Sequence, residues 1–367
     1  MNIGVPKETA ANERRVALTP DVAGRLVKAG FSVLVERGAG EAASFGDDAF
    51  GAAGATLVAT AAEVFGQSDI VLKVQPPSAQ EVRLSREGGA LVALFQPSAE
   101  RETVSQLAAR RVTAFSLALL PRITRAQPMD VLSSQATVAG YKAVLLAAAA
   151  TGRFFPMLVT AAGTLSPARV LVLGAGVAGL QAIATARRLG AVVSAFDVRA
   201  AVKEQVESLG AKFLAMQIGE QAEAAGGYAK QLSEETHRRE LAFLAEQLKD
   251  ADVVITTAAI PGKRAPILIT ADAVRGMKPG SVIVDLAVET GGNCELAEAG
   301  IDVRRHGVLI LGPVNLPSTV PVHASQMYAK NVSSFLLHVT RDGTLVLDFD
   351  DEIIRETCVT HAGEVRK

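Results

Sequence analysis

"RVLVLGAGVAGLQAIATARRLGA" (169–191) is the stretch that decides the expected fold, because it joins an apolar strand to a glycine-rich turn and a helix. The run RVLVL leads directly into Gly174, Gly176 and Gly179, which have the spacing G-x-G-x-x-G. Apolar residues then recur at helical spacing up to Gly190, and glycine commonly ends helices. A strand, a glycine loop and a helix in this order predict a dinucleotide-binding α/β unit.

Each glycine of the loop has its own task in such a unit. Gly174 allows the tight turn, Gly176 lets the backbone approach a pyrophosphate, and Gly179 permits close packing of helix on strand. The first helical turn, with Val177 and Ala178, offers N–H groups and the positive end of the helix dipole to the phosphates. The alternative is a glycine-rich turn without a ligand, which the ordered strand, loop and helix disfavour.

The next expected strand, VVSAFDVR (192–199), ends at a carboxylate. A carboxylate in this place accepts hydrogen bonds from the adenine-ribose hydroxyls and repels a 2′-phosphate, so Asp197 favours NAD(H) over NADP(H). Arg199 is the exception to this reasoning, because an arginine here can serve NADP(H). Directly after a retained aspartate, Arg199 is interpreted as flanking the adenosine or as a surface residue, and Val198 lies between them in the same expected site.

Short β-like runs alternate with helical patterns along the whole chain, which predicts an α/β protein with mostly parallel sheets. In the first third the expected strands are Asn2–Val5, Ser32–Glu36, Ile70–Val74, Ala90–Ala93 and Thr113–Ser116. In a second series the expected strands are Val170–Leu173, Val192–Asp197, Lys212–Ala215, Val253–Thr257, Val282–Leu286 and Val308–Leu311.

We therefore expect two Rossmann-like doubly wound domains with a cleft between them, joined by a long Ala-rich helix over 136–160. The first domain is expected to be discontinuous, with residues 1–133 and 320–367, because the single helix expected at 324–339 cannot form a third domain. The NAD(H)-binding domain is expected at 134–319.

Composition excludes several classes of protein. The 367 residues carry a net charge of −1 and no Trp, so nothing indicates a nucleic-acid partner. Cys294 and Cys358 have no metal-ligand or redox spacing, and no metal site is expected. The apolar segment 139–163 is interrupted by charges and a proline, so a core helix is expected there rather than a membrane span. The N-terminus has no signal-peptide pattern, so a cytoplasmic location is expected.

A nicotinamide enzyme that oxidises an alcohol or an amino acid must move a proton as well as a hydride, which requires a general acid/base. The polar residues expected at the strand ends of the first domain are Arg15, Lys73 and Gln96, and glutamine cannot act as a base. The chain's five histidines are all taken to lie outside the first domain; they are His237, His306, His323, His338 and His361. This pattern argues against a self-contained dehydrogenase, although Lys73 keeps that possibility open.

Three segments resemble the superfamily of alanine dehydrogenase and the NAD(H)-binding component of proton-translocating nicotinamide nucleotide transhydrogenase. They are MNIGVPKETAANERRVALTP (1–20), VLKVQPP (71–77) and GAGVAGLQ (174–181). Five more segments look like the transhydrogenase branch: PRITRAQPMDVLSSQ (121–135), DVRAAVKEQVESLGAKF (197–213), AGGYAKQLSEE (225–235), PGKRAPILIT (261–270) and MKPGSVIVDLAVETGGNCEL (277–296). Alanine dehydrogenases typically carry a catalytic histidine at the position of Gln96.

In that family the loop matching 121–135 closes the nicotinamide end of the cofactor site, which implies catalytic roles for Arg122, Gln127, Asp130 and Ser133. Arg122 can hold a pyrophosphate or ribose oxygen with two N–H groups, and Asp130 can orient it. By the resemblance, Gln127 reaches towards the second nucleotide. Arg125 is interpreted as a surface or partner contact, and Pro128 departs from the family pattern. A salt-bridge cluster at the domain joint is the alternative interpretation.

The polar stretch Gly219–Glu235 is long for a connection between a strand and a helix. The resemblance implies a lid in which Gly227 and Tyr228 touch the adenosine part of the cofactor. A disordered surface insertion is the alternative. Ala258, at the end of a later strand, completes the expected cofactor-binding set.

The resemblance implies that this chain binds NADH and passes hydride directly to NADP+ on a partner subunit, coupled to proton movement by a membrane subunit. No general acid/base is needed for such a transfer. A homodimer on the cytoplasmic face of the cell membrane, held there through its partners, is also implied. The alternatives are an alanine dehydrogenase, in which Arg15 and Lys73 bind a carboxylate and Gln96 replaces the acid/base, and a non-catalytic NAD(H)-sensing module.

Overall fold

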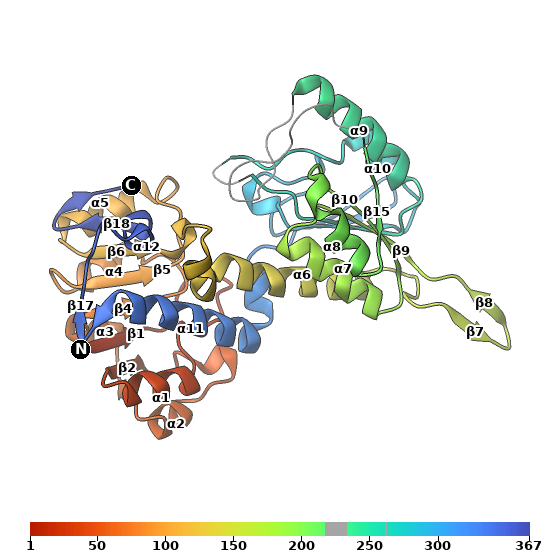
Figure 1. Ribbon diagram of the computed structural model, residues 1–367. Coiled ribbons are helices and arrows are strands. Elements are labelled where there is room, and N and C mark those ends of the chain that lie inside the picture. Colours follow the sequence, from red (N-terminus) through yellow and green to blue (C-terminus); the bar gives the residue numbers. More distant parts are fainter. Residues whose placement is uncertain (217–232, 261–262) are drawn as a thin grey trace. The chain divides into compact units, whose positions relative to one another are not determined.

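The structure is a computed structural model that describes residues 1–216, 233–260 and 263–367. These residues form two compact units (Figure 1). The first unit comprises Met1–Gln135 and Pro317–Lys367, and the second comprises Ala136–Leu316. The sequence places the same junctions at 133/134 and 319/320. Both units are built on sheets with mainly parallel strands, which confirms the predicted fold class.

The sheet of the first unit has eight strands among the described residues: β1 (Asn2–Val5), β2 (Ser32–Glu36), β3 (Thr56–Val58), β4 (Ile70–Leu72), β5 (Ala90–Ala93), β6 (Thr113–Ser116), β18 (Cys358–His361) and β19 (Glu364–Val365). The strands β3-β2-β1-β4-β5-β6 lie in this order and are parallel, while β18 and β19 form an antiparallel edge next to β6. This is the strand order of a doubly wound dinucleotide-binding sheet, whose direction of winding reverses between β1 and β4.

The helices that cover this sheet are α1 (Pro20–Lys28), α2 (Asp47–Ala52), α3 (Ala61–Gln67), α4 (Ala79–Leu84), α5 (Arg101–Ala109), α11 (Pro321–His338) and α12 (Glu352–Thr357). Helix α11, from the C-terminal segment, packs into the core of the unit, where Tyr328 and Phe335 are fully buried. The ring of Phe335 meets that of Phe115 on β6 edge to face, with centroids 5.3 Å apart. This packing holds the C-terminal segment on the first unit.

The second unit repeats the same winding. Its sheet contains β9 (Arg169–Leu173), β10 (Val192–Phe196), β11 (Lys212–Phe213), β12 (Val253–Thr256), β13 (Val282–Asp285), β14 (Asp302–Arg305) and β15 (Val308–Leu311). The order is β11-β10-β9-β12-β13-β15-β14, and only β14 is antiparallel to its neighbour in the described part of this sheet. The winding reverses between β9 and β12, which is where sheets of this type bind ligands.

Four helices are described within the second unit: α7 (Val177–Arg188), α8 (Lys203–Ser208), α9 (Glu234–Leu248) and α10 (Ala271–Arg275). Strands β12 and β13 are apolar, rich in β-branched residues and buried along their whole length, as expected for parallel strands covered by helices on both faces. The short strands β7 (Leu158–Thr160) and β8 (Gly163–Leu165) form an antiparallel hairpin that extends away from the rest of this unit (Figure 1).

The Ala-rich helix is shorter than the sequence predicts. Helix α6 spans Val131–Ala150, whereas the expected helix covers 136–160. The chain turns at Gly152 and Pro156 and then enters the β7–β8 hairpin, so the apolar residues after position 154 belong to exposed strands. Two further strands, β3 and β14, were also absent from the prediction, because three- and four-residue strands with one or no fully buried side chain lack a clear apolar pattern.

Helix α6 is the one described helix that is long and apolar enough to cross a membrane by length and composition. Ala143, Val144 and Ala147 on one face are fully buried in the core of the second unit, which is typical of a core helix in a globular protein. Lys142, which is partly exposed, interrupts the apolar character of the helix.

Candidate functional site

The loop between β9 and α7 is a tight turn whose glycines have different surroundings. Gly174 adopts φ +97°, a left-handed conformation that glycine tolerates and that turns the chain sharply after the strand. A Cβ atom on Gly179 would lie 1.9 Å from the carbonyl oxygen of Gly174, so only glycine fits where helix meets strand. A Cβ atom on Gly176 would meet no described atom within 4 Å, which leaves open space beside this residue.

Helix α7 begins at this open space. The N–H of Leu180 donates to the carbonyl oxygen of Gly176 at 2.8 Å, which closes the first turn of the helix. The N–H groups of the preceding residues, including Val177 and Ala178, have no acceptor within a helix and can donate to an anion. Behind them, Gly140 of α6 comes so close that a Cβ atom there would lie 2.1 Å from the carbonyl oxygen of Ala178. Helix α6 therefore supports the start of α7 from one side.

Asp197 directly follows β10 and connects to the glycine loop. Its Oδ2 accepts a hydrogen bond from the backbone N–H of Ala175 at 2.8 Å. Its side chain is 5 % exposed and also faces Arg199, whose Nε donates to Oδ1 at 2.8 Å and whose Nη2 donates to Oδ2 at 2.7 Å. The interpretation of Arg199 as a possible surface residue was wrong, because its side chain is 13 % exposed and pairs with Asp197 through two N–H groups. Val198, between them, is partly buried.

The end of β12 lies against the same loop, on the other side of the reversal in strand order. The hydroxyl of Thr257 donates to the carbonyl oxygen of Gly174 at 2.9 Å. A Cβ atom on Gly174 would lie 3.0 Å from the backbone nitrogen of Ala258, so Ala258 borders the glycine loop directly. The amide side chain of Asn293 accepts from the N–H of Ala258 at 3.0 Å and donates to its carbonyl oxygen at 2.9 Å, which fixes this residue's backbone.

Asp285, at the end of β13, organises these loops and was not identified from the sequence. Its fully buried carboxylate accepts hydrogen bonds from four donors at 2.8–2.9 Å: the hydroxyl of Thr256 and the backbone N–H groups of Ala287, Asn293 and Cys294. A buried carboxylate needs such donors to offset its desolvation. The available signal was an aspartate that ends the apolar run VIVD and precedes the turn Gly291-Gly292.

The expected lid residues Gly227 and Tyr228 lie outside the described residues. The described chain resumes at Ser233, whose hydroxyl accepts from the backbone N–H of Thr236 and caps the N-terminus of α9. Helix α9 packs on the end of β10 through Phe243 and Phe196, whose ring centroids lie 5.7 Å apart.

The polar loop 121–135 belongs to the first unit and brings three of its four predicted residues together. Nη1 of Arg122 donates to Oδ2 of Asp130 at 3.0 Å and to the hydroxyl of Ser133 at 3.2 Å. The hydroxyl of Ser133 donates to Oδ2 of Asp130 at 2.6 Å, and its backbone N–H donates to Oδ1 at 2.9 Å. Asp130 therefore holds Arg122 and also accepts from the first turn of α6.

The fourth predicted residue, Gln127, lies on the short 3-10 helix η3 (Thr124–Met129) with its side chain exposed. Pro128 is part of the same helix, and its carbonyl oxygen accepts from the side chain of Asn331 on α11 at 2.7 Å. Arg125 pairs with Asp351 at 2.8 Å within the first unit, although its side chain remains 61 % exposed. The charges of Arg125 and Asp351 thus compensate each other in this loop.

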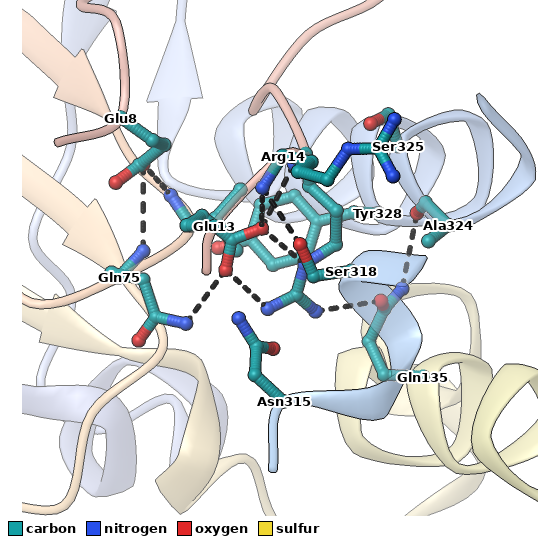
Figure 2. Close-up of polar contacts among 12 residues, drawn as sticks. Glu8, Glu13, Arg14, Gln75, Gln135, Asn315, Ser318, Ala324, Ser325 and Tyr328 are labelled. Carbon is teal, nitrogen blue, oxygen red and sulfur yellow. Dashed lines mark hydrogen bonds and ion pairs between the residues drawn. The ribbon is translucent and has the colours of Figure 1, made fainter. Parts of the chain in front are cut away.

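Arg15, a candidate substrate-binding cation, is buried in a cluster of internal partners (Figure 2). Its Nε and Nη2 donate to the two carboxylate oxygens of Glu13 at 2.8 and 2.7 Å, and its Nη1 donates to Oε1 of Gln135 at 2.8 Å. The amide of Gln75 also donates to Glu13, at 2.7 Å. Burial by itself raises the pKa of Glu13, but the hydrogen bonds and charge of Arg15 outweigh it and hold this pKa at about 2.

Lys73, the second candidate cation, follows β4 at the point where the first sheet reverses its winding. Its ammonium lies 3.0 Å from Oε2 of Glu8 and 2.9 Å from Oε1 of Glu81, and its side chain is 1 % exposed. Burial disfavours the charged ammonium, but the two carboxylates outweigh burial and raise the pKa of Lys73. An ammonium that stays charged between two carboxylates is a poor general base.

Gln96, which follows β5, has an exposed side chain. The expectation that the histidines lie outside the first domain was wrong for three of them, because the segment Pro317–Lys367 returns to the first unit. The ring of His338 lies 3.2 Å from Asp351, and that of His361 lies 3.1 Å from the hydroxyl of Thr113. His323 is exposed on α11.

The glycine loop, the carboxylate after the second strand and the strand order of the second unit define a class. A two-unit α/β chain of this kind, with one unit built on a dinucleotide-binding sheet, is a nucleotide-binding protein of the doubly wound type.

Comparison with known proteins assigns the chain within this class. Residues 4–139 match the N-terminal domain, and residues 143–367 match the C-terminal domain, of the family described as alanine dehydrogenase/PNT. The chain belongs to this family. It is 52 % identical to the first of the polypeptides that make up NAD(P) transhydrogenase subunit alpha in Rhodospirillum rubrum, over all of this chain and 97 % of that protein.

Two solved structures are similar to the whole chain. The transhydrogenase from Sinorhizobium meliloti superposes with a TM-score of 0.91 at 47 % identity, and each chain is fully covered. An L-alanine dehydrogenase superposes with a TM-score of 0.85 at 28 % identity, over all of this chain and 96 % of that one. The fold is common to both, whereas sequence identity is clearly higher on the transhydrogenase side.

Proposed function

We propose that this chain is the NAD(H)-binding component of a proton-translocating transhydrogenase. In this role it binds NADH and allows hydride transfer to NADP+ that is bound on a partner subunit. The observation that carries the proposal is the 52 % identity to a transhydrogenase alpha subunit along the whole chain. The glycine loop at the reversal of the second sheet supplies the matching physical site.

The residues at this loop fit a dinucleotide. The open space at Gly176 and the first N–H groups of α7 suit a pyrophosphate. The carboxylate of Asp197 suits the adenosine ribose hydroxyls, and the fixed backbone of Ala258 borders the loop on its other side. In the first unit, Arg122 with Asp130 and Ser133 forms a polar cluster of the type that holds a phosphate or ribose oxygen, and the exposed amide of Gln127 has both a donor and an acceptor to offer.

The proposed reaction requires positioning rather than proton transfer. A reduced nicotinamide supplies a hydride, and an oxidised nicotinamide accepts it without a proton. The contacts of the first unit support this assignment, because Lys73 is held between Glu8 and Glu81 and Arg15 is held by Glu13. The role left to the chain's residues is to orient the ring and to exclude water.

We expect this component to form a homodimer and to act on the cytoplasmic face of the cell membrane through an NADP(H)-binding subunit and a proton-conducting membrane subunit. The β7–β8 hairpin supports association of two copies, because it presents apolar side chains to solvent. Val159 is 75 % exposed, and Met157 and Leu165 are 59 % and 48 % exposed. Such a concentration of exposed apolar residues on one hairpin is typical of an interaction surface.

The decisive experiment mixes the pure chain with an NADP(H)-binding transhydrogenase subunit, NADPH and an acetylpyridine analogue of NAD+. We expect reduction of the analogue with both proteins present and little turnover with either alone. If the chain binds NADH but gives no transfer in the mixture, a non-catalytic NAD(H)-sensing module becomes the better assignment.

An alanine dehydrogenase remains the second candidate, because the structural likeness to that enzyme extends over the whole chain. It is tested by incubating the pure chain with pyruvate, ammonia and NADH. We expect no consumption of NADH above the protein-free control, since Gln96 cannot donate a proton as a histidine does. Rapid consumption would replace the transhydrogenase proposal.

A further inference from the structure

The ion pair between Asp197 and Arg199 fills the carboxylate that the proposed function assigns to the adenosine ribose. Oδ1 of Asp197 accepts from the backbone N–H of Arg199 at 2.9 Å and from its Nε at 2.8 Å. Oδ2 accepts from the N–H of Ala175 at 2.8 Å and from Nη2 of Arg199 at 2.7 Å. A carboxylate accepts about four hydrogen bonds, so all of its acceptor positions are already in use.

A ribose hydroxyl can reach this carboxylate only by replacing one of these donors. The N–H groups of Ala175 and Arg199 are held by the backbone of the glycine loop and of the turn after β10. The guanidinium of Arg199 is the donor on a flexible side chain, so it is the group that a ribose would displace. It follows that the guanidinium occupies the edge of Asp197 where the ribose hydroxyls are expected.

This placement bears on the choice between NAD(H) and NADP(H). A guanidinium at the 2′ position of an adenosine ribose can bind a 2′-phosphate through two N–H groups. In this chain the same guanidinium has a carboxylate within hydrogen-bond distance, and its side chain is 13 % exposed. The carboxylate cancels the positive charge, engages Nε and Nη2, and adds a negative charge that repels a phosphate.

We infer that Arg199 is a phosphate-binding group that Asp197 keeps inactive, so that the pair, and not the aspartate alone, determines nucleotide selectivity. The inference rests on the proposed function, in which Asp197 receives the adenosine ribose. When the carboxylate loses its charge, Arg199 becomes available to a 2′-phosphate, and the site accepts NADPH.

The experiment measures the dissociation constants of NADH and NADPH by isothermal titration calorimetry on the full chain. Wild type is compared with Asp197→Asn, Arg199→Gln and the double variant Asp197→Asn/Arg199→Gln. Asn keeps the shape of Asp197 and one acceptor oxygen, and Gln keeps an N–H donor without charge. Circular dichroism and thermal unfolding confirm that each variant is folded.

For Asp197→Asn we expect the ratio of the NADPH to the NADH dissociation constant to fall on the order of a hundredfold, through tighter NADPH and weaker NADH binding. In the double variant this gain for NADPH disappears, because the guanidinium is missing. Arg199→Gln alone leaves Asp197 without its counter-charge, so NADPH is excluded about tenfold more strongly than in wild type.

The possible results separate this inference from the proposed function. If wild type binds neither nucleotide, the proposed function is wrong. If wild type binds NADH but Asp197→Asn gains no affinity for NADPH, or the double variant gains as much, the inference is overturned and the proposed function stands. If Asp197→Asn does not fold, Arg199→Gln decides alone, because an unchanged or lower ratio of dissociation constants in that variant contradicts the inference.

Discussion

Nη1 of Arg122 lies 3.0 Å from Oδ2 of Asp130, and this contact ties the polar loop to the start of α6. Asp130 also accepts from the hydroxyl and the backbone N–H of Ser133 in the first turn of the helix. One carboxylate therefore holds a guanidinium and a helix end together. If Arg122 acts on the nucleotide, its direction depends on Asp130.

Replacement of Asp130 by Asn should reduce hydride transfer in the reconstituted system about tenfold, because Arg122 loses its charged partner while the shape of the loop is kept. We expect the rate at saturating NADH to fall more than the affinity for NADH. The measurement is the steady-state rate with the NADP(H)-binding subunit, together with NADH titration by calorimetry.

Arg125→Gln is the matched control for this variant. Arg125 is an arginine of the same loop, but its partner is Asp351, next to α12. Its replacement should leave the transfer rate within about twofold of wild type, since surface ion pairs contribute little. An Asp130→Asn enzyme that is as active as the control would show that Arg122 has no role in transfer.

Two glycines of the nucleotide loop should respond differently to a methyl group. Gly176→Ala places its Cβ in open space and keeps an allowed backbone, with φ −77°, so the free protein should unfold at the wild-type temperature. The added methyl group lies where a pyrophosphate is expected, so affinity for NADH should fall by at least tenfold. Calorimetry and thermal unfolding measure the two effects separately, and unchanged NADH affinity would remove the phosphate from this loop.

Gly179→Ala should instead damage the fold. Its Cβ would lie 1.9 Å from the carbonyl oxygen of Gly174, which is backbone and cannot rotate away. We expect a loss of about 3 kcal/mol in the free energy of unfolding, the cost of overpacking at a rigid contact. Urea unfolding checks this value, and a variant as stable as Gly176→Ala would contradict the close packing of α7 on β9.

The sequence predicted those parts of the fold and site that depend on neighbouring residues. The glycine loop, the strands next to it and the polar loop each lie within about 25 consecutive residues, so their spacing alone carries the signal. Arg122 and Asp130 are eight positions apart and meet as predicted. Strand β14 was missed because only one of its four residues is buried.

Contacts between distant segments could not be predicted in the same way. Arg15 meets Gln135 across 120 positions, and Ala258 is fixed by Asn293 across 35 positions. Neither pair has a pattern of spacing, because the sheet topology brings the residues together only after folding. Arg199 illustrates a different limit: both residues of its ion pair were identified, but the sequence does not show which donors fill the carboxylate.

The Glu13–Arg15 pair should make stability depend on pH in the acid range. The pKa of Glu13 is held at about 2, below its ordinary value of 4.5, so the folded state binds this proton less readily than the unfolded state. The stabilisation is therefore complete above about pH 5 and is lost as the pH falls from 4.5 through about 2. The difference between the two pKa values corresponds to on the order of 3 kcal/mol.

In Glu13→Gln this contribution is absent at every pH. We expect the urea midpoint of the variant to lie below that of wild type at pH 7 and to decrease less than that of wild type between pH 5 and pH 2. Parallel curves for the two proteins across this range would mean that Glu13 does not titrate against Arg15 in the folded state.

The β7–β8 hairpin provides a test of the proposed homodimer. Val159 is 75 % exposed on a two-stranded hairpin, and an isolated hairpin of this size gains little stability from its own contacts. Val159→Glu should therefore fold as wild type does, yet bring a charge into any interface formed by this surface. In sedimentation velocity we expect wild type to be a dimer and Val159→Glu to dissociate at micromolar concentration. Ile301→Glu is the control, because Ile301 is an aliphatic residue of the same unit that is 52 % exposed away from the hairpin strands, and it should remain dimeric. If Val159→Glu stays dimeric while Ile301→Glu dissociates, the interface lies near β14 and the hairpin serves another purpose.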